Sequence, residues 1–214
     1  MILTHCGKLG DFLYCLPIAE WLFRERGEKT HWVLPRAFEP FNYIEALLML
    51  QPHCEKVTLV DHALVNFEAG GQPYRFNPAD YGVEGEYRNL GFRSYPNEYI
   101  SAFYAKEHGL GYRGFTLKIW EDEPWPKTKE CLRSGEESMD KLAPFAEKLP
   151  DTVDLLGLIR RIASADEFHT WYCGLAVLAW FAGVPQHIYR VRGHAAKHLY
   201  FPTSQTITWH EVRL

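Results

Sequence analysis

Residues 1–61 alternate short apolar runs with longer segments of helical periodicity, and this alternation constrains the fold more than any other feature of the sequence. Strands are expected at residues 1–5, 29–35 and 55–61, and helices at 11–27 and 40–52. Parallel neighbours in a sheet need a crossover connection, which is usually a helix. The order strand–helix–strand–helix–strand therefore predicts a parallel α/β sheet.

The rest of the chain is less regular. Residues 61–96 show no periodicity and are rich in Gly, Asn, Tyr and Arg, which is typical of either a functional loop or an unrecognised element. Beyond them we expect a helix at 97–111, a strand at 115–120, helices at 136–149 and 152–165, a strand-to-turn transition at 166–170, an apolar helix within 171–185, and strands at 186–191 and 205–212.

Composition excludes several classes of protein. With 23 Lys and Arg against 27 Asp and Glu, the net charge of −4 argues against a general nucleic-acid coat. The five cysteines form no C-x-x-C pair, so we expect free, buried thiols rather than a disulfide framework or a zinc knuckle. No apolar run approaches the length of a membrane span, and the opening residues lack the pattern of a signal peptide. A cytoplasmic protein is expected.

A glycine-flanked turn, CGKLGD at residues 6–11, joins the first predicted strand to the first predicted helix. In an open parallel sheet, ligands bind beyond the carboxyl ends of strands, and Gly7 and Gly10 would let the backbone approach a ligand closely. Lys8 adds a positive charge. The turn matches neither a P-loop nor a G-x-G-x-x-G pattern. Asp11 fits two roles: the N-cap of the helix, or a general base directed at an acceptor hydroxyl.

Residues 1–61 resemble the amino-terminal segment of the heptosyltransferase-like glycosyltransferases. The stretches that carry the resemblance are GKLGDFLYCLPIAEWLFRERG, KTHWVLP and EKVTLVD, which contain a Gly-Asp pair at the first strand–helix turn and a Leu-Pro pair within the helix. The resemblance implies that Asp11 is the catalytic base, with Gly10 and Lys8 beside it as acceptor-binding residues.

The stretch at residues 155–185, LLGLIRRIASADEFHTWYCGLAVLAWFAGVP, resembles the donor-binding region of the same family. Gly174 corresponds to the turn glycine of the family. Thr170 is suited to cap the apolar helix, whose free N–H groups could hold a diphosphate. His169 lies near the turn and is a further donor-binding candidate, or else a strand-end histidine bonded to backbone. The segment EDEPWPK resembles one in which a lysine contacts the donor phosphate, which implies that role for Lys127.

The resemblance implies an α/β chain of compact GT-B type, with two reduced Rossmann-like lobes of mainly parallel sheets: an acceptor-side lobe at 1–95 and a donor-side lobe at 96–214. The expected activity moves a sugar from a nucleotide-sugar donor to an acceptor hydroxyl, with no metal and no cofactor. The acceptor is a saccharide or a nucleic acid. Two family positions, normally Asp and His, are Tyr172 and Val177 here. A second hypothesis is therefore a non-catalytic nucleotide- or sugar-binding module. The aromatic and arginine content of residues 74–95 supports a third, a transferase acting on a nucleic-acid base.

Overall fold

The computed structural model describes residues 1–36, 39–65, 75–90, 98–120, 127–128, 130–152, 154–192 and 207–213, with the backbone alone for 39–42. The described residues of Met1–Phe115 form one compact unit, and those that follow Phe115 form a second. Each unit is an α/β structure around one all-parallel sheet, so the predicted fold class is confirmed.

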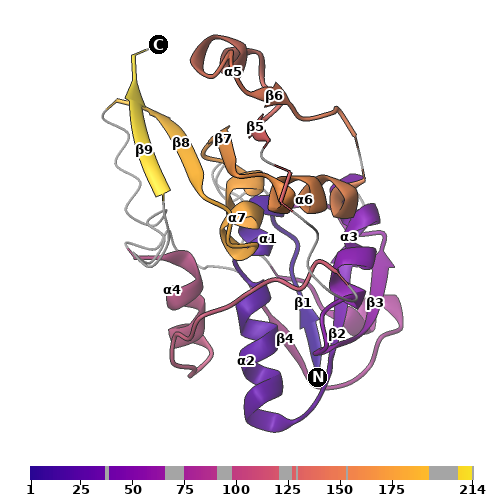
Figure 1. The fold of residues 1–214 in the computed structure, drawn as a ribbon. Coiled ribbons are helices and arrows are strands. Elements are labelled where there is room, and N and C mark those ends of the chain that lie inside the picture. Colours follow the sequence, from indigo (N-terminus) through magenta and orange to yellow (C-terminus); the bar gives the residue numbers. More distant parts are fainter. Residues whose placement is uncertain are drawn as a thin grey trace. The chain divides into compact units, whose positions relative to one another are not determined.

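The sheet of the first unit has the strand order β3-β2-β1-β4, and all its pairs are parallel (Figure 1). The predicted strands and helices of residues 1–61 are present, with somewhat different limits. The elements are β1 (Ile2–Thr4), α1 (Leu9–Leu13), α2 (Leu16–Arg26), β2 (Thr30–Pro35), α3 (Glu39–Met49), β3 (Cys54–Val60), a 3₁₀ turn (Pro78–Tyr81), β4 (Tyr87–Asn89) and α4 (Ile100–Glu107).

The helix predicted at 11–27 is two helices. Pro17 is the second residue of α2, and the chain turns at residues 14–15 between α1 and α2. Proline lacks an N–H group and is tolerated in the first turn of a helix but not inside one. A continuous helix from residue 11 would have placed Pro17 in its interior, so α2 begins anew at Leu16.

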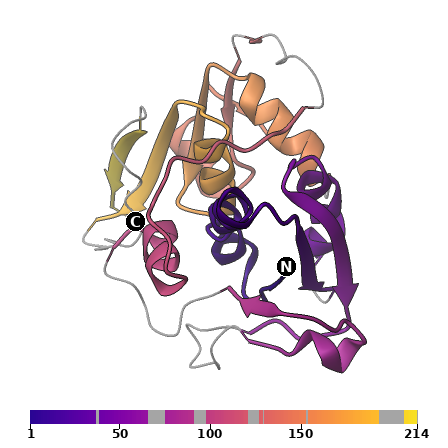
Figure 2. The same ribbon diagram turned by 90° about the horizontal axis from the view of Figure 1, so that it is seen from below.

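The stretch without periodicity contains a strand of the sheet. β4 runs parallel to β1 in the register Ile2 with Tyr87 and Thr4 with Asn89, and it is the magenta arrow in Figure 2. The Thr4 hydroxyl donates to Oδ1 of Asn89 at 2.7 Å, and the Leu90 amide donates to the Thr4 carbonyl at 2.8 Å. These bonds attach a strand of three residues that has no sequence signal of its own.

The limit between the two units lies after Phe115 rather than after residue 95. α4 belongs to the first unit because it packs against α2, and the Ser101 hydroxyl donates to the Tyr14 carbonyl at 2.9 Å. The assignment of the two lobes to acceptor and donor stays a prediction.

The second unit has the strand order β6-β5-β7-β8-β9, again all parallel, with β9 at one edge as predicted. The Ala-, Leu- and Ile-rich segments at 152–165 and 171–185 contain helices as expected. The elements are β5 (Cys131–Arg133), α5 (Glu137–Leu142), β6 (Glu147–Lys148), α6 (Leu155–Ser164), β7 (Glu167–Trp171), α7 (Gly174–Phe181), β8 (Gln186–Val191) and β9 (Ile207–Val212).

Two predicted elements of this unit are wrong. Residues 115–120 form no strand, and the Leu117 amide instead donates to the Phe181 carbonyl at the end of α7. The helix predicted at 136–149 ends at Leu142, because Pro144 restricts the residue before it and cannot continue the helical hydrogen bonds. β6 follows in its place.

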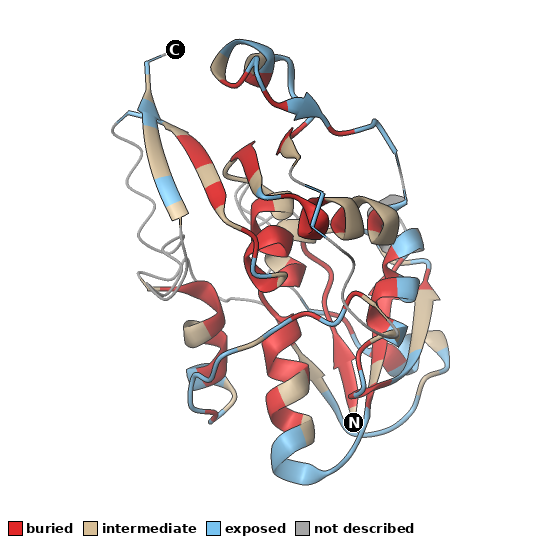
Figure 3. Cartoon of the chain, viewed as in Figure 1, coloured by how far each residue is buried: buried red, intermediate tan, exposed pale blue. Residues whose placement is uncertain are grey.

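The two faces of the second sheet differ in chemistry. α7 packs against β7 and β8 with side chains that are almost all buried, and Figure 3 shows it red along most of its length. Side chains alternate between the faces along a strand, so Phe168 and Ile188 face α7. The other face carries His169, His187 and Tyr189, and α5 covers only part of it.

Lys127 closes the end of α6. Its ammonium donates to the carbonyls of Ala163 and Ala165 at 2.9 and 3.0 Å. The last carbonyls of a helix have no partner within it, and they form the negative end of the helix dipole. A lysine at this place therefore stabilises the C-terminus of α6.

No helix in the parts of the chain that the structure describes has the length and apolar character needed to cross a membrane.

Two histidines of the first unit are buried and uncharged at neutral pH. His5 is fully buried, and burial lowers its pKa to about 4 even though backbone hydrogen bonds, including one to the Leu90 carbonyl, act in the opposite direction. Burial and, secondarily, the Arg24 charge lower the pKa of His53 to about 4. In the unfolded chain both would have the ordinary pKa of 6.5.

We expect acid to destabilise the protein between pH 6.5 and about 4. Over this range the unfolded chain binds protons at His5 and His53 and the folded chain does not, so the stabilisation is complete above pH 6.5 and is lost as the pH falls. Each histidine contributes up to about 3 kcal/mol to the fall. Urea unfolding at a series of pH values should show a smaller acid loss for His53→Gln than for wild type. An unchanged pH slope would contradict the argument.

Lys127→Met should lower the free energy of unfolding by about 1 kcal/mol, because two carbonyls at the end of α6 lose their donor. Methionine keeps the apolar stem, so the change isolates the ammonium. Lys141→Met, which alters an exposed lysine in the last turn of α5, is the matched control. Urea unfolding measures both, and equal effects of the two substitutions would refute the capping role.

Candidate functional site

The turn between β1 and α1 places Asp11 beyond the carboxyl end of β1. α1 begins at Leu9, and the Phe12 amide donates to the Lys8 carbonyl at 3.0 Å. Asp11 is therefore the third residue of this short helix and is half-buried, while Lys8 is exposed. Gly10 is the second helical residue. The three residues predicted for catalysis and acceptor binding thus lie together in one turn.

The N-cap alternative for Asp11 is wrong. Lys8 is the N-cap residue, with extended backbone and no capping bond from its side chain. Because α1 starts earlier than the sequence suggested, Asp11 falls within its first turn. A carboxylate there still interacts favourably with the positive end of the helix dipole.

The order of strands puts this turn at the kind of position where α/β sheets generally bind ligands. From β1 the chain moves outward in one direction to β2 and β3, and then returns to pair β4 on the other side of β1. The direction reverses between β1 and β4, and ligands bind outside the carboxyl ends of the strands at such a reversal. Asp11 follows β1 at that end of the sheet.

Two buried residues that the sequence analysis did not single out for the site, His5 and Cys15, contact the turn and the strand end beside it. His5 follows β1, and its Nδ1 lies 2.6 Å from the Leu90 carbonyl oxygen. The Cys15 thiol lies 3.8 Å from the same nitrogen and donates to the Asp11 carbonyl at 3.5 Å. Burial, and next the Asp11 charge, raise the pKa of Cys15 well above its ordinary value, so it remains a thiol. The sequence signal that could have identified His5 was its position as a polar residue at the end of an apolar strand.

Phe12 fixes α1 to the sheet. Its ring is fully buried and meets the ring of Trp32 edge to face at 5.1 Å between centroids. Asp11 is the residue directly before it. The backbone of Asp11 is thereby attached to a rigid element, which is how protein sites hold reacting groups in position.

In the second unit, the turn between β7 and α7 carries Gly174 as the first residue of the helix. The N-cap is Cys173, and no side chain caps the helix. The expected capping by Thr170 is wrong, because β7 continues through Trp171 and leaves Thr170 fully buried in the strand. Its hydroxyl donates to the Trp171 carbonyl at 2.9 Å and lies 3.4 Å from the Cys173 thiol.

His169 and Thr170 are adjacent in β7 and so face opposite sides of the sheet. His169 Nδ1 lies 3.0 Å from the Tyr189 hydroxyl and its ring stacks on His187 at 4.3 Å. Burial, and next the neighbouring His187, lower the pKa of His169. The structure does not bring His169 to the turn at Gly174 that was expected to bind the donor.

The ammonium of Lys127, also predicted to bind the donor, donates to carbonyls at the end of α6. The two positions that depart from the family pattern have packing partners. Val177 is buried inside α7, and the ring of Tyr172 stacks on Trp209 at 6.5 Å. Of the aromatic and arginine-rich stretch at 74–95, Tyr74 and residues 91–95 lie outside the described residues.

The fold of the chain is similar to solved glycosyltransferases. The glycosyl transferase family 9 protein from Veillonella parvula DSM 2008 is 12% identical with a TM-score of 0.62, and the match covers 99% of this chain and 85% of that one. The E. coli heptosyltransferase WaaC, solved with ADP-2-deoxy-2-fluoro heptose, is 11% identical with a TM-score of 0.57, over 96% and 91%.

A third similar structure is the iron-containing dodecameric glycosyltransferase TibC from enterotoxigenic E. coli H10407. It is 14% identical with a TM-score of 0.60, and the match covers 96% of this chain and 61% of that one. No protein-family profile and no curated protein sequence matches the chain. At these identities the likeness is one of fold, and the chain has the fold of the heptosyltransferase-like glycosyltransferases, as its resemblance to them predicted.

Proposed function

We propose that the chain is a glycosyltransferase that moves a sugar from a nucleotide-sugar donor to an acceptor hydroxyl. The observation that carries the proposal is the place of Asp11, a half-buried carboxylate just beyond β1 where the strand order of the sheet reverses. Ligands of open parallel sheets bind at this place. The fold shared with glycosyltransferases supports the same reaction class.

Asp11 is the general base of the proposed reaction. Its carboxylate accepts the proton of the acceptor hydroxyl while the hydroxyl oxygen bonds to the anomeric carbon of the donor sugar. The bond from that carbon to the phosphate oxygen breaks, and its electron pair leaves with the nucleoside diphosphate. Lys8 and Gly10 flank the acceptor, as a charge and as a position where the backbone can approach closely. We take a saccharide as the acceptor in this proposal. We also propose that the protein acts in the cytoplasm.

The donor diphosphate is placed at the N-terminus of α7, beginning at Gly174, where N–H groups and the helix dipole favour negative charge. Stabilisation of the leaving group by these groups needs no metal ion. Thr170, His169 and Lys127 stay predicted donor residues, although their polar atoms have partners within the second unit. ADP-heptose is the first donor to test, because WaaC was solved with an analogue of it and TibC with ADP-D-beta-D-heptose.

A non-catalytic nucleotide- or sugar-binding module is the second candidate. What favours it is the packing of Val177, which is 1% exposed and so offers no polar group at a position where the family has histidine. A module of this kind would raise its melting temperature with ADP or ADP-heptose, since ligands that bind only the folded state stabilise it. It would release no nucleoside diphosphate with any acceptor.

Asp11→Asn should lower the rate of transfer by a factor of about 10²–10⁴, the usual contribution of a general base. The amide keeps the shape of the carboxylate, so the melting temperature and the affinity for ADP should change little. The measurement is the release of nucleoside diphosphate from ADP-heptose, and from other nucleotide sugars, across a panel of saccharide acceptors.

Asp61→Asn is the matched control, because Asp61 follows β3 at the same end of the sheet but away from the reversal of strand order. It should keep wild-type activity. Undiminished transfer by Asp11→Asn would remove the base role. Nucleotide binding by the wild-type protein without turnover on any acceptor would favour the binding module.

A further inference from the structure

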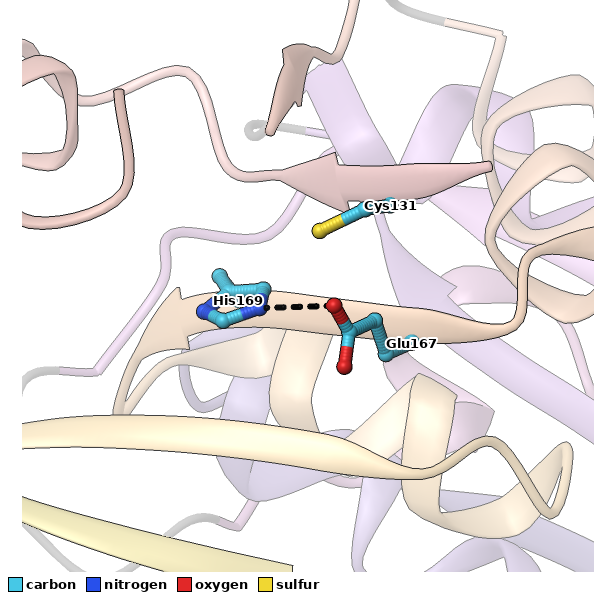
Figure 4. A group of neighbouring side chains, drawn as sticks. All are labelled: Cys131, Glu167 and His169. Atoms are coloured by element: carbon cyan, nitrogen blue, oxygen red, sulfur yellow. Dashed lines mark ion pairs between the residues drawn. The ribbon is translucent and has the colours of Figure 1, made fainter. Parts of the chain in front are cut away.

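Three side chains of different chemistry meet on the partly covered face of the second sheet. Cys131 is the first residue of β5, and Glu167 and His169 lie on the neighbouring β7, where Cys131 is paired with Glu167. Figure 4 shows the Cys131 thiol directed from β5 toward the imidazole and the carboxylate on β7. The sulfur, one carboxylate oxygen and one ring nitrogen all lie within 4.8 Å of one another.

The spacing is close to that of a tetrahedral zinc site. Zinc binds sulfur at ~2.3 Å and nitrogen or oxygen at ~2.0–2.2 Å, which puts neighbouring ligand atoms roughly 3.3–3.6 Å apart. His169 Nε2 and Glu167 Oε1 are 3.5 Å apart. The Cys131 sulfur lies within 4.8 Å of both atoms and would form the third corner.

His169 carries the second, independent observation. The residue is 3% exposed, and its Nδ1 is bonded to the Tyr189 hydroxyl. Its Nε2 is buried and has no hydrogen bond among the residues that the structure describes. A buried polar atom without a partner costs about 1–3 kcal/mol. This nitrogen faces the Glu167 carboxylate, so a cation between the two would satisfy both.

The candidate ligands are themselves held in place by neighbours, as metal ligands in proteins usually are. Tyr189 fixes the ring of His169 through Nδ1. Glu167 Oε2 lies 3.3 Å from His187 Nε2. His187 Nδ1 is in turn hydrogen-bonded to His210 Nε2 at 3.0 Å. The other carboxylate oxygen, Oε1, is thereby directed toward His169 and Cys131.

Without a metal, the thiol is hydrogen-bonded to the carboxylate. Burial, and next Glu167, raise the pKa of Cys131 to about 12. This contact accounts for the sulfur and for Glu167 without any ion. Glu167 Oε1 is also the partner of His169 Nε2, but their separation of 3.5 Å is at the limit of a hydrogen bond, and a metal ion between the two atoms would bind both at shorter distances.

We propose that Cys131 Sγ, Glu167 Oε1 and His169 Nε2 bind a zinc ion, with water as the fourth ligand. On binding, the Cys131 proton leaves to solvent and the sulfur coordinates as thiolate. A ligand set of one sulfur, one nitrogen and one oxygen suits zinc, whereas magnesium and calcium take oxygen ligands.

The ion would join β5 to β7 and act on stability rather than on transfer. Cys131 and Glu167 are the first residues of their strands, at the amino ends. Substrates of α/β sheets bind at the carboxyl ends. His169, which is also a predicted donor residue, is the one residue that the zinc site shares with the proposed function. The test of the zinc site uses the metal alone, so it does not depend on finding the transferase substrate.

The test is zinc binding by the full chain after treatment with a chelator, measured by calorimetry and by metal content. We expect one zinc per chain and a melting temperature that rises with zinc. Cobalt(II) in place of zinc should give a sulfur-to-cobalt charge-transfer band in the near ultraviolet. Cys131→Ser and Glu167→Gln should each weaken zinc binding by about 100-fold or more, and Tyr189→Phe by about 10–100-fold.

Cys54→Ser removes another free thiol, in the first unit, and should leave zinc affinity and the cobalt band unchanged. If Cys131→Ser fails to fold, the cobalt band of the wild-type protein and the Glu167→Gln variant still decide the matter. No zinc binding by wild type at micromolar zinc would overturn the proposal. Binding that survives Cys131→Ser or Glu167→Gln at wild-type affinity, or a cobalt complex without the charge-transfer band, would overturn it as well.

Discussion

The first unit depends on the pairing of β1 on both of its edges. β1 is three residues long, and it is held by β2 on one side and by β4 on the other. Thr4 fixes the register with β4 through its bond to Asn89. A slip of one residue would turn every side chain of the strand to the opposite face. The turn with Asp11 begins directly beyond this strand, so the position of the carboxylate depends on two ladders of backbone hydrogen bonds rather than on local preference.

The two faces of the second sheet differ in polarity: one is apolar and covered by a helix, and the other carries polar side chains. The α7 side is covered by a helix of small and apolar residues, as parallel sheets in α/β proteins usually are. The other side carries a row of imidazole, carboxylate and phenol groups that bond to one another across β7, β8 and β9. Burying polar groups is unfavourable unless they find partners. In this row the partners are side chains of the neighbouring strands. Among the described residues of the row, His169 Nε2 is the buried atom that makes no hydrogen bond, and it lies 3.5 Å from Glu167 Oε1.

Much of the fold could be predicted from local patterns. The strands predicted at 29–35, 55–61 and 186–191 are short apolar-rich runs, and the helices predicted at 152–165 and within 171–185 are longer apolar-rich segments; each is present. β4 and β5 could not be found in this way, because their sequences, YRN and CLR, contain no apolar run and these strands gain their stability from the strands beside them. Two prolines interrupt helices that a purely periodic interpretation had extended through them: Pro17 lies in the first turn of α2, and Pro144 follows the end of α5.

The sequence by itself determined the α/β class, the turn that holds Lys8, Gly10 and Asp11, and the resemblance to heptosyltransferase-like proteins, because these reside in contiguous residues. Only the tertiary structure decided that β4 lies beside β1, that His169 and Thr170 face opposite sides of β7, and that Cys131 meets Glu167. The physical reason is the range of the interactions. Helical periodicity and turn chemistry act over a few residues, whereas the pairing of parallel strands joins segments far apart in the chain and sets which side chains become neighbours.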